Sequence, residues 1–258
     1  MHLAACFVTA IGEMNSTLPQ TAIVTGAGKR VGAELTRGLL DDGWTVLAHV
    51  RDAGDDVPPG AVKVVADLAE PDCADTIFAG AASLPPVRLL VNSAARFAFD
   101  SLEQFSPDEF DAHMAVNVRA PLLLIRRFAS GHDGGDALIA NILDSKLAAP
   151  NPDFFSYTLS KQALGAATEL AARALAGQGI RVNAVAPALM LRSPGQSKAN
   201  FDAMHEANPL GRGVEPDDVL AAIRYLATAK TVTGQCLVVD GGQRFMKLDR
   251  DVQFLGDQ

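Results

Sequence analysis

The chain has 258 residues, of which 48% are hydrophobic and 20% charged, with 22 Gly and 14 Pro, a composition that excludes disordered, collagen-like and low-complexity proteins. The length fits one large α/β domain with a sizeable buried core. Because 30 Asp and Glu outnumber 22 Lys and Arg, the net charge of −8 is unsuited to binding a phosphate backbone, and we expect no nucleic-acid partner.

The first 20 residues are predicted to be an extension, disordered in part, that precedes a single domain over residues 21–258. The apolar run at residues 3–12 is too short to span a bilayer, and no Lys or Arg precedes Lys29 as the basic region of a secretory signal would require. We therefore expect a cytoplasmic protein without a membrane partner, with Met14 rather than Met1 as its functional start. The three cysteines form no C-x-x-C pair and the five histidines no H-x-x-x-H pair, so we also expect no metal centre.

Short apolar runs alternate with helical patterns along the rest of the chain. The predicted strands are residues 21–25, 45–50, 62–66, 88–91, 137–142, 181–185 and 235–239, and the predicted helices are residues 31–42, 71–82, 107–128, 154–176 and 216–228. The strands are rich in Val, Ile, Leu and Ala, as parallel strands buried on both faces are. The sequence thus predicts a doubly wound α/β domain, a seven-stranded parallel sheet with helices on both faces. Residues 189–212 lack regular periodicity and follow a strand's carboxyl end, so we interpret them as a substrate lid or wall.

The first predicted strand leads directly into a glycine-containing turn, TGAGKRVG at residues 25–32, and then into a helix. Glycine lets the backbone turn tightly and approach a pyrophosphate, and the free N–H groups at the start of the helix attract its charge. Val31 stands where the strict G-x-G-x-x-G pattern has its last glycine, so a plain strand-to-helix turn is the alternative. The predicted cofactor-binding residues of this turn are Gly26, Gly28, Lys29, Arg30, Val31 and Gly32.

The end of the second predicted strand indicates which dinucleotide would bind. A fold of this kind that selects NAD places an acidic residue there on the ribose 2′-hydroxyl, but the sequence VLAHVR at residues 46–51 has no carboxylate before Asp52. Arg51, together with Lys29 and Arg30, can instead surround a 2′-phosphate, because guanidinium groups bind that dianion through paired hydrogen bonds. NADPH is therefore the predicted cofactor, with His49 and Arg51 in its site, unless Arg51 is only a solvated loop charge.

Tyr157 and Lys161 lie four residues apart in a strongly helical stretch, so both side chains project from one face of the helix. A nearby ammonium stabilises a phenolate and brings proton exchange by a tyrosine closer to neutral pH. Such a tyrosine can donate a proton to a substrate that is reduced by hydride. A half-exposed helix also carries such pairs for solubility, and this is the alternative.

These features together resemble the short-chain dehydrogenase/reductase family, over residues 21–242. The matching motifs are the turn at residues 25–32, Asp67-Leu68 after the third strand, Asn92-Ser93-Ala94 after the fourth, Asn117, Tyr157 with Lys161, Pro187 after the sixth strand, and DGG at residues 240–242. The resemblance implies a Rossmann-type NAD(P)-dependent oxidoreductase that acts on a small molecule and assembles as a homotetramer or dimer. It also implies that Tyr157 is the acid/base, that Lys161 binds the nicotinamide ribose and lowers the tyrosine pKa, that Asn117 holds a proton-relay water, and that Asp67 lies near the adenine.

Four positions depart from the pattern of that family. Arg30 replaces a usual glycine, and Ser93 and Ala95 replace the second Asn and the Gly of Asn-Asn-Ala-Gly. Asp144 stands 13 residues before Tyr157, where the family has a substrate-orienting serine. An ionised Asp144 would accept hydrogen bonds from substrate N–H groups and a protonated one could donate, unless this residue merely caps a loop.

The departures are similar to those of the pteridine reductase and dihydromonapterin reductase branch of the family. In that branch an aromatic residue shortly after the fourth strand stacks on the pterin, and Phe97 is the matching residue here, with a core aromatic as the alternative. The resemblance implies that Arg30 reaches the cofactor phosphate and the polar edge of the substrate.

The predicted function is hydride transfer from NADPH to a C=N or C=O bond of a dihydropterin, with Tyr157 and Asp144 as candidate proton donors. One alternative is a ketone or 3-oxoacyl reductase of the same family. Another is a non-catalytic protein that senses NADPH.

Overall fold

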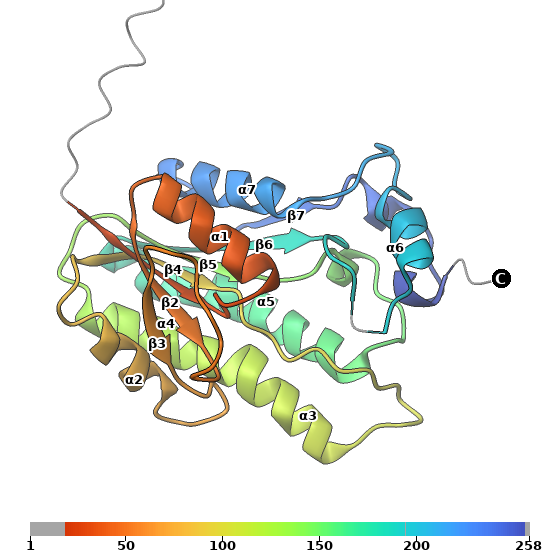
Figure 1. Ribbon diagram of the computed structural model, residues 1–258, viewed down its shortest axis with the longest axis horizontal. Coiled ribbons are helices and arrows are strands. Elements are labelled where there is room, and N and C mark those ends of the chain that lie inside the picture. The colour runs from red at the N-terminus through yellow and green to blue at the C-terminus, as the bar shows by residue number, and fades with distance from the viewer. Residues whose placement is uncertain (1–18, 194, 256–258) are drawn as a thin grey trace, which may run out of the picture.

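In the computed structural model, which describes residues 19–193 and 195–255, the strands form one parallel sheet in the order β3-β2-β1-β4-β5-β6-β7 (Figure 1). The strands are β1 Thr21–Thr25, β2 Thr45–Val50, β3 Val62–Val65, β4 Val87–Asn92, β5 Ala137–Ile142, β6 Ile180–Pro187 and β7 Cys236–Val239. Every pair of neighbouring strands is parallel, which confirms the predicted fold class. Met14 and most of the predicted extension lie outside the described residues.

The helices fall in the intervals between the strands. They are α1 Arg30–Asp41, α2 Cys73–Gly80, α3 Pro107–Met114, α4 Ala120–Gly131, α5 Phe155–Leu175, α6 Lys198–His205 and α7 Pro216–Thr228. A π-helical segment, Ala115–Arg119, joins α3 to α4, so the single helix predicted for residues 107–128 is one continuous element with a wide turn in its middle. Among the described residues, no helix is long and apolar enough to cross a membrane.

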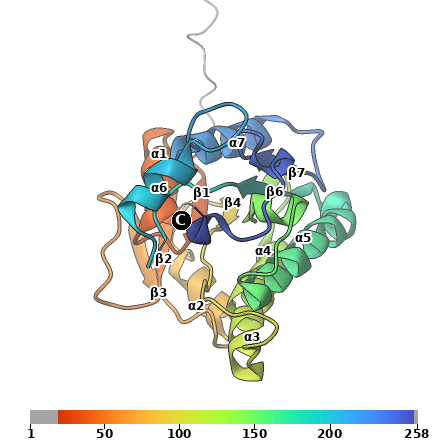
Figure 2. The same ribbon diagram turned by 90° about the vertical axis from the view of Figure 1, so that its right-hand side faces the viewer.

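Two helical layers cover the two faces of the sheet (Figure 1, Figure 2). Ala22 and Val24 of β1 belong to the apolar cluster that α1 and α7 cover, and Ile23 between them belongs to the cluster that α2, α4 and α5 cover. Successive side chains of a strand point to opposite faces, so a continuous apolar run supplies both layers at once. All five residues of β1 are buried, as this arrangement requires.

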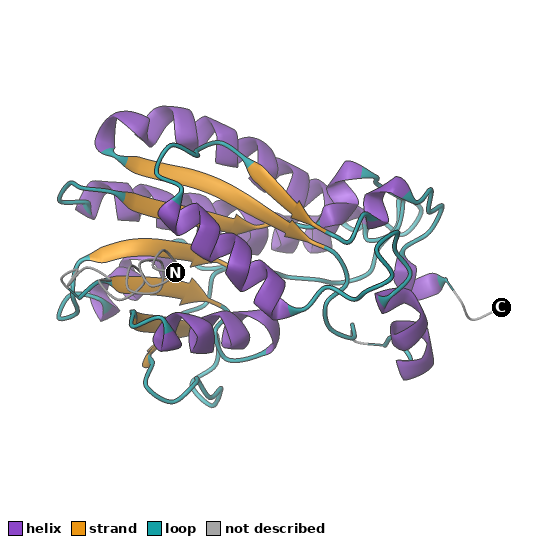
Figure 3. Cartoon of the chain, turned by 90° about the horizontal axis from the view of Figure 1, so that it is seen from above, coloured by secondary structure: helices purple, strands orange, loops and turns teal. Residues whose placement is uncertain are grey.

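The carboxyl ends of the strands point toward a group of loops, α6 and the C-terminal segment (Figure 3). The prediction that residues 189–212 are irregular was wrong for α6, which begins after Ser197, whose hydroxyl accepts the Asn200 N–H at 3.0 Å. This helix has only eight residues and few of them are buried, so its sequence shows no apolar periodicity from which a helix could be predicted.

Candidate active site

A cavity of ≈ 690 Å³ lies where β1, β2, β4, β5 and β6 end. Open α/β sheets bind ligands at this edge. Most of the predicted site residues line it, namely Gly26, Gly28, Lys29, Arg30, Val31, Gly32, His49, Arg51, Asp67, Leu68, Ser93, Ala94, Phe97, Asp144, Tyr157, Lys161 and Pro187. Asn92 and Asn117 do not line the cavity, and both are buried behind it.

The turn after β1 leaves little room for a side chain at Gly26, Gly28 and Gly32. Gly26 has a φ of +69°, and a Cβ on Gly32 would lie 2.1 Å from the Gly26 carbonyl oxygen. The Thr25 hydroxyl fixes the turn against the loop after β4 by accepting the Ser93 and Ala94 N–H groups at 3.0 and 3.1 Å. The first turn of α1 has no side-chain cap and no acidic residue, so its N–H groups and the positive end of its dipole face the cavity, as an anion site needs.

Arg30 has a backbone conformation that favours glycine. Its φ is +55°, a left-handed value that costs a non-glycine residue about 1 kcal/mol. Its guanidinium donates to the carbonyl oxygens of Leu191 and Arg192 at 3.3 and 2.8 Å. These contacts join the first turn to the loop after β6, and since Arg30 also lines the cavity, its predicted contacts with a cofactor phosphate and the substrate stay a prediction.

His49 is buried and holds the first turn in place. Its Nδ1 accepts the Gly26 N–H at 3.2 Å, which leaves the proton on Nε2 to be donated to the Ala66 carbonyl oxygen at 2.9 Å. Burial lowers the pKa of His49, so the imidazole is neutral at neutral pH. Both nitrogens therefore bond within the protein and hold the first turn, while His49 also lines the cavity and its predicted contact with the cofactor stays a prediction.

Two of the three basic side chains predicted to surround a 2′-phosphate are paired with acidic neighbours. Lys29 lies 3.4 Å from Asp55, and Arg51 donates twice to Asp52, at 3.0 and 3.1 Å. Both cations are largely exposed. Exposed ion pairs contribute about 0–1 kcal/mol, so either cation can leave its neighbour for a dianion.

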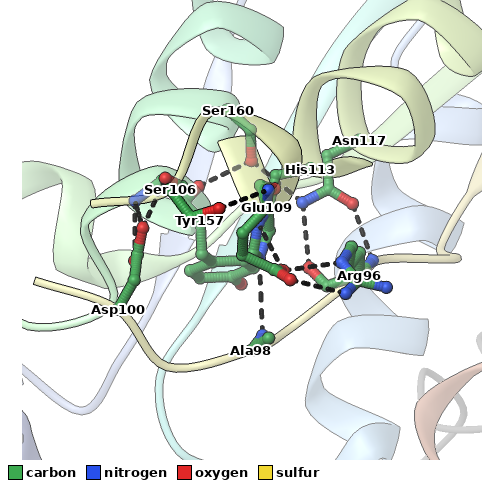
Figure 4. A network of polar contacts seen from close by, with 10 residues as sticks. Arg96, Ala98, Asp100, Ser106, Glu109, His113, Asn117, Tyr157 and Ser160 are labelled. Atoms are coloured by element: carbon green, nitrogen blue, oxygen red, sulfur yellow. Dashed lines mark hydrogen bonds and ion pairs between the residues drawn. The ribbon is translucent and has the colours of Figure 1, made fainter. Parts of the chain in front are cut away.

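Asn92 and Asn117 bind other parts of the protein. Asn92 donates to Asn141 at 2.8 Å, and its own Oδ1 is buried without a partner among the described residues. Asn117, in the π-helical segment, accepts the Arg96 N–H at 2.7 Å and donates to the Arg96 carbonyl and to Ser160 (Figure 4). The side chain of Asn117 thus fixes the loop after β4, and the predicted relay water is untested.

Tyr157 and Asp144 meet at the carboxyl end of β5. The Tyr157 hydroxyl donates to Asp144 Oδ2 at 3.0 Å, and the Lys146 N–H donates to Asp144 Oδ1 at 2.9 Å. Asp144 is half-buried and Tyr157 is 7% exposed. Asp144 therefore faces the tyrosine in the position where the family pattern has a serine.

Burial and nearby negative charge raise the pKa of both members of this pair. Burial raises the pKa of the Asp144 carboxyl above its ordinary value. Burial and the charge of Asp144 raise the pKa of Tyr157, so the predicted lowering of that pKa by Lys161 was wrong for the protein without ligands. Lys161 lies 5.8 Å from the centroid of the tyrosine ring and donates to the Ile142 carbonyl at 2.7 Å, and burial lowers its own pKa to about 8.

Phe97 forms part of the cavity wall beside the tyrosine. Its ring stacks on Phe154 with centroids 4.3 Å apart and meets the edge of Tyr157 at 4.8 Å. It remains 39% exposed, so it is not a core aromatic. One face of the ring is covered by Phe154, and its remaining exposed surface is open to a ligand.

Asp100 is a functional residue that the sequence analysis missed. The helix that carries Tyr157 has Phe154 at its N-cap, in a left-handed conformation and without a side-chain cap. Asp100, from the loop after β4, supplies the cap by accepting the Ser156 N–H at 2.9 Å and the Ser156 hydroxyl (Figure 4). An aspartate 56 residues before the helix carries no local capping pattern, so only the fold identifies it.

Comparison with known proteins identifies the family. A family model described as enoyl-(acyl carrier protein) reductase matches residues 27–244. A protein of Picea abies named short-chain type dehydrogenase/reductase is 31% identical, over 87% of this chain and 92% of its own. The chain belongs to the short-chain dehydrogenase/reductase family. As a member of this family it is an NAD(P)-dependent oxidoreductase.

Three further proteins that are similar to this chain are named for different substrates. L-xylulose reductase of Mesocricetus auratus is 31% identical, over 86% of this chain and 95% of its own. The crystal structure of FolM alternative dihydrofolate reductase 1 from Brucella suis in complex with NADP has a TM-score of 0.81 at 32% identity, covering 88% of this chain and 95% of that one. The 3-ketoacyl-(acyl-carrier-protein) reductase of Brucella melitensis complexed with NADH has a TM-score of 0.77 at 28% identity, covering 87% and 98%.

Proposed function

We propose that the protein reduces a dihydropterin with hydride from NADPH. The observation that carries this proposal is the 3.0 Å hydrogen bond between Tyr157 and Asp144, which puts a carboxyl in place of the alcohol of the family pattern. A carboxyl can accept from the N–H groups of an aminopyrimidine ring or donate a proton to a ring nitrogen. The likeness to the FolM alternative dihydrofolate reductase of Brucella suis supports the same substrate class.

The residues around the first turn fit a dinucleotide with a 2′-phosphate. The closely packed glycines and the uncapped start of α1 suit the pyrophosphate. Lys29 and Arg51 would exchange Asp55 and Asp52 for the 2′-phosphate. When bound, the cofactor supplies the hydride. The complexes of the two Brucella FolM proteins with NADP support this choice.

The protein's own residues supply the proton and orient the substrate. Tyr157 keeps its proton at neutral pH, because burial and Asp144 raise its pKa, and it is therefore competent as an acid. Asp144 lies on the same hydroxyl and can hold the substrate's polar edge or replace the proton that the tyrosine gives up. The half-exposed ring of Phe97 offers a flat apolar surface to a heteroaromatic substrate.

Steady-state oxidation of NADPH tests this proposal. Purified protein is assayed with dihydrobiopterin, dihydromonapterin and dihydrofolate, and with xylulose and a 3-oxoacyl thioester. We expect turnover of a dihydropterin, a loss of at least about 100-fold in kcat for Tyr157→Phe, and retained NADPH binding in that variant. Turnover of ketones alone would refute the pterin assignment.

A carbonyl reductase is the second candidate function, favoured by the similarity to L-xylulose reductases and to a 3-ketoacyl reductase. Asp144→Ser restores the family residue and is the matched variant. If the natural substrate is a dihydropterin, this variant loses activity on it and gains activity on ketones. If the natural substrate is a ketone, Asp144→Ser leaves dihydropterin turnover at background.

A further inference from the structure

The C-terminal segment, residues 246–255, forms one wall of the active-site cavity. Met246, Leu248, Asp251 and Val252 line it together with Asp144 and Tyr157. The segment lies beyond the carboxyl ends of the strands, next to α6 (Figure 1, Figure 3). It therefore brings the end of the chain to the reacting groups.

Contacts with the loop before α5 and with α6 hold the C-terminal segment in place. Arg250 Nε donates to both carboxylate oxygens of Asp153 at 2.8 and 3.0 Å, and the Asp251 N–H donates to the same carboxylate at 2.8 Å. The ring of Phe254 stacks on Phe154 with centroids 5.9 Å apart. Asn200 of α6 donates to the carbonyl oxygens of Val252 and Leu255. The position of Asp251 is thus fixed by ion-pair, aromatic and backbone contacts.

Lys146 lies between the carboxyl groups of Asp144 and Asp251. Its backbone N–H donates to Asp144 at 2.9 Å, whereas its ammonium lies 3.3 Å from Asp251 Oδ2 and also donates to the Asp153 carbonyl. The lysine side chain is 9% and that of Asp251 18% exposed, so water screens their pairing only in part. The Lys146 ammonium therefore pairs with Asp251, while its charge also acts on Asp144 and lowers the pKa of that carboxyl.

We propose that Asp251 is a positioning residue for Asp144: by pairing with the Lys146 ammonium, it offsets that cation beside the Asp144 carboxyl, which is then able to keep a proton for the substrate. This inference rests on the proposed function, in which Asp144 serves as a proton donor or hydrogen-bond partner of the substrate. It assigns a role in the reaction to the last turn of the described chain.

The groups that face Asp144 come from three elements. Lys146 on the 3₁₀ segment Ser145–Ala148 donates its N–H, Tyr157 on α5 donates its hydroxyl with Lys161 on the same helix face, and Asp251 contributes a negative charge from the C-terminal segment. Burial raises the pKa of Asp144, and the charge of Asp251 raises it further, against the two hydrogen bonds and the charge of Lys146, which lower it. Removal of the Asp251 charge therefore favours the ionised form of Asp144 in two ways. It removes a repulsive negative charge, and it frees the Lys146 ammonium to interact with Asp144.

Asp251→Asn isolates this charge effect. Asp251 also caps the 3₁₀ segment Val252–Phe254 by accepting the Gln253 N–H. Because Asn and Ser are as effective at this capping position as Asp, the variants Asp251→Asn and Asp251→Ser remove the negative charge and keep the cap. Asp249→Asn is the matched control, because Asp249 is exposed and lies outside the cavity lining while it belongs to the same segment.

The titration of Asp144 in the protein without ligands is the deciding measurement. It is followed by carboxyl ¹³C NMR of aspartate-labelled protein, with the signal assigned by its loss in Asp144→Asn. We expect the midpoint to move to lower pH in both Asp251 variants and to stay in place in Asp249→Asn. Equal midpoints in wild type and the two Asp251 variants would overturn the inference, as would an equal shift in the control.

The pH profile of kcat/KM for a dihydropterin gives the catalytic readout. Loss of the Asp144 proton ends the acid-dependent reaction, so the alkaline limb moves to lower pH in the Asp251 variants and not in the control. If the wild type turns over no dihydropterin, the proposed function fails while the NMR titration still decides the role of Asp251. If the limb stays in place although the midpoint moves, the catalytic part of the inference is refuted.

Discussion

Replacing Asp100 by alanine removes the cap of the helix that carries Tyr157, and we expect it to lower the free energy of unfolding by about 3 kcal/mol. Asp100 is 3% exposed and Ser156 is fully buried. The carboxylate accepts both the N–H and the hydroxyl of Ser156. Asp100→Ala leaves these two buried donors unpaired, at about 1–3 kcal/mol each, and removes a negative charge from the positive end of the helix dipole.

Asp100→Asn separates the contributions. The amide oxygen keeps one acceptor at the helix start, but the charge is lost and the NH₂ group faces donors, so we expect a cost of about 1–2 kcal/mol. Ser106→Ala is the control, because Ser106 caps α3 from its own N-terminus by accepting the Glu109 N–H, and such a cap contributes about 1 kcal/mol.

Equilibrium unfolding in urea measures all three variants, and a loss of 3 kcal/mol corresponds to a fall of about 6–12 °C in Tm for a chain of this size. Because Tyr157 lies in the first turn of α5, kcat of Asp100→Ala should also fall, while the Kd for NADPH, whose proposed site is the turn after β1, should change little. If Asp100→Ala costs no more than Ser106→Ala, the carboxylate does not cap the helix in the way described here.

Three other residues give predictions of different kinds. Burial lowers the pKa of Lys161 from 10.5 to about 8, so between these pH values the folded protein binds fewer protons than the unfolded chain. The free energy of unfolding of wild type relative to Lys161→Met should therefore rise by about 3 kcal/mol from pH 8 to 10.5, measured by urea titration at each pH. A difference that does not change with pH would contradict the lowered pKa. Arg30→Gly should be about 1 kcal/mol more stable than Arg30→Ala, because only glycine relieves the φ of +55°, and equal stabilities would argue against that conformation. Gly32→Ala should cost at least about 2 kcal/mol, because its Cβ would lie 2.1 Å from a carbonyl oxygen, whereas Gly54→Ala, with nothing within 4 Å, should be close to neutral in the same assay.

The strands could be predicted from the sequence because each is a short run of apolar residues that the sheet buries on both faces. Strand β5 was predicted with its observed bounds, and all six of its residues are buried. The same reasoning failed for α6, which is held by partners far along the chain. Asn200 donates to the carbonyl oxygens of Val252 and Leu255, and no local pattern marks such contacts.

Within the site, the sequence predicted the residues whose spacing is set by one helix or one motif. Tyr157, Lys161 and Asp144 could be placed together because regular helical spacing and the family pattern fix their relation. The partners of Arg30 and Asp100 could not, since these contacts join residues 162 and 56 positions apart. Sequence spacing carries no information on such pairs until the topology is known.

The positions that depart from the family pattern and those that keep it have different tasks in this cavity. Tyr157 and Lys161 keep the family residues, and proton transfer depends on them in the proposed mechanism. Arg30 and Asp144 depart from the pattern, and one donates to the loop after β6 while the other binds the tyrosine hydroxyl. The strain of about 1 kcal/mol at Arg30 is comparable to the net gain from its two charge-assisted hydrogen bonds, so the contact with the loop after β6 can offset it. In the proposed function the departures at Arg30 and Asp144 alter the substrate side of the cavity, while the pair Tyr157 and Lys161 keeps its role in proton transfer.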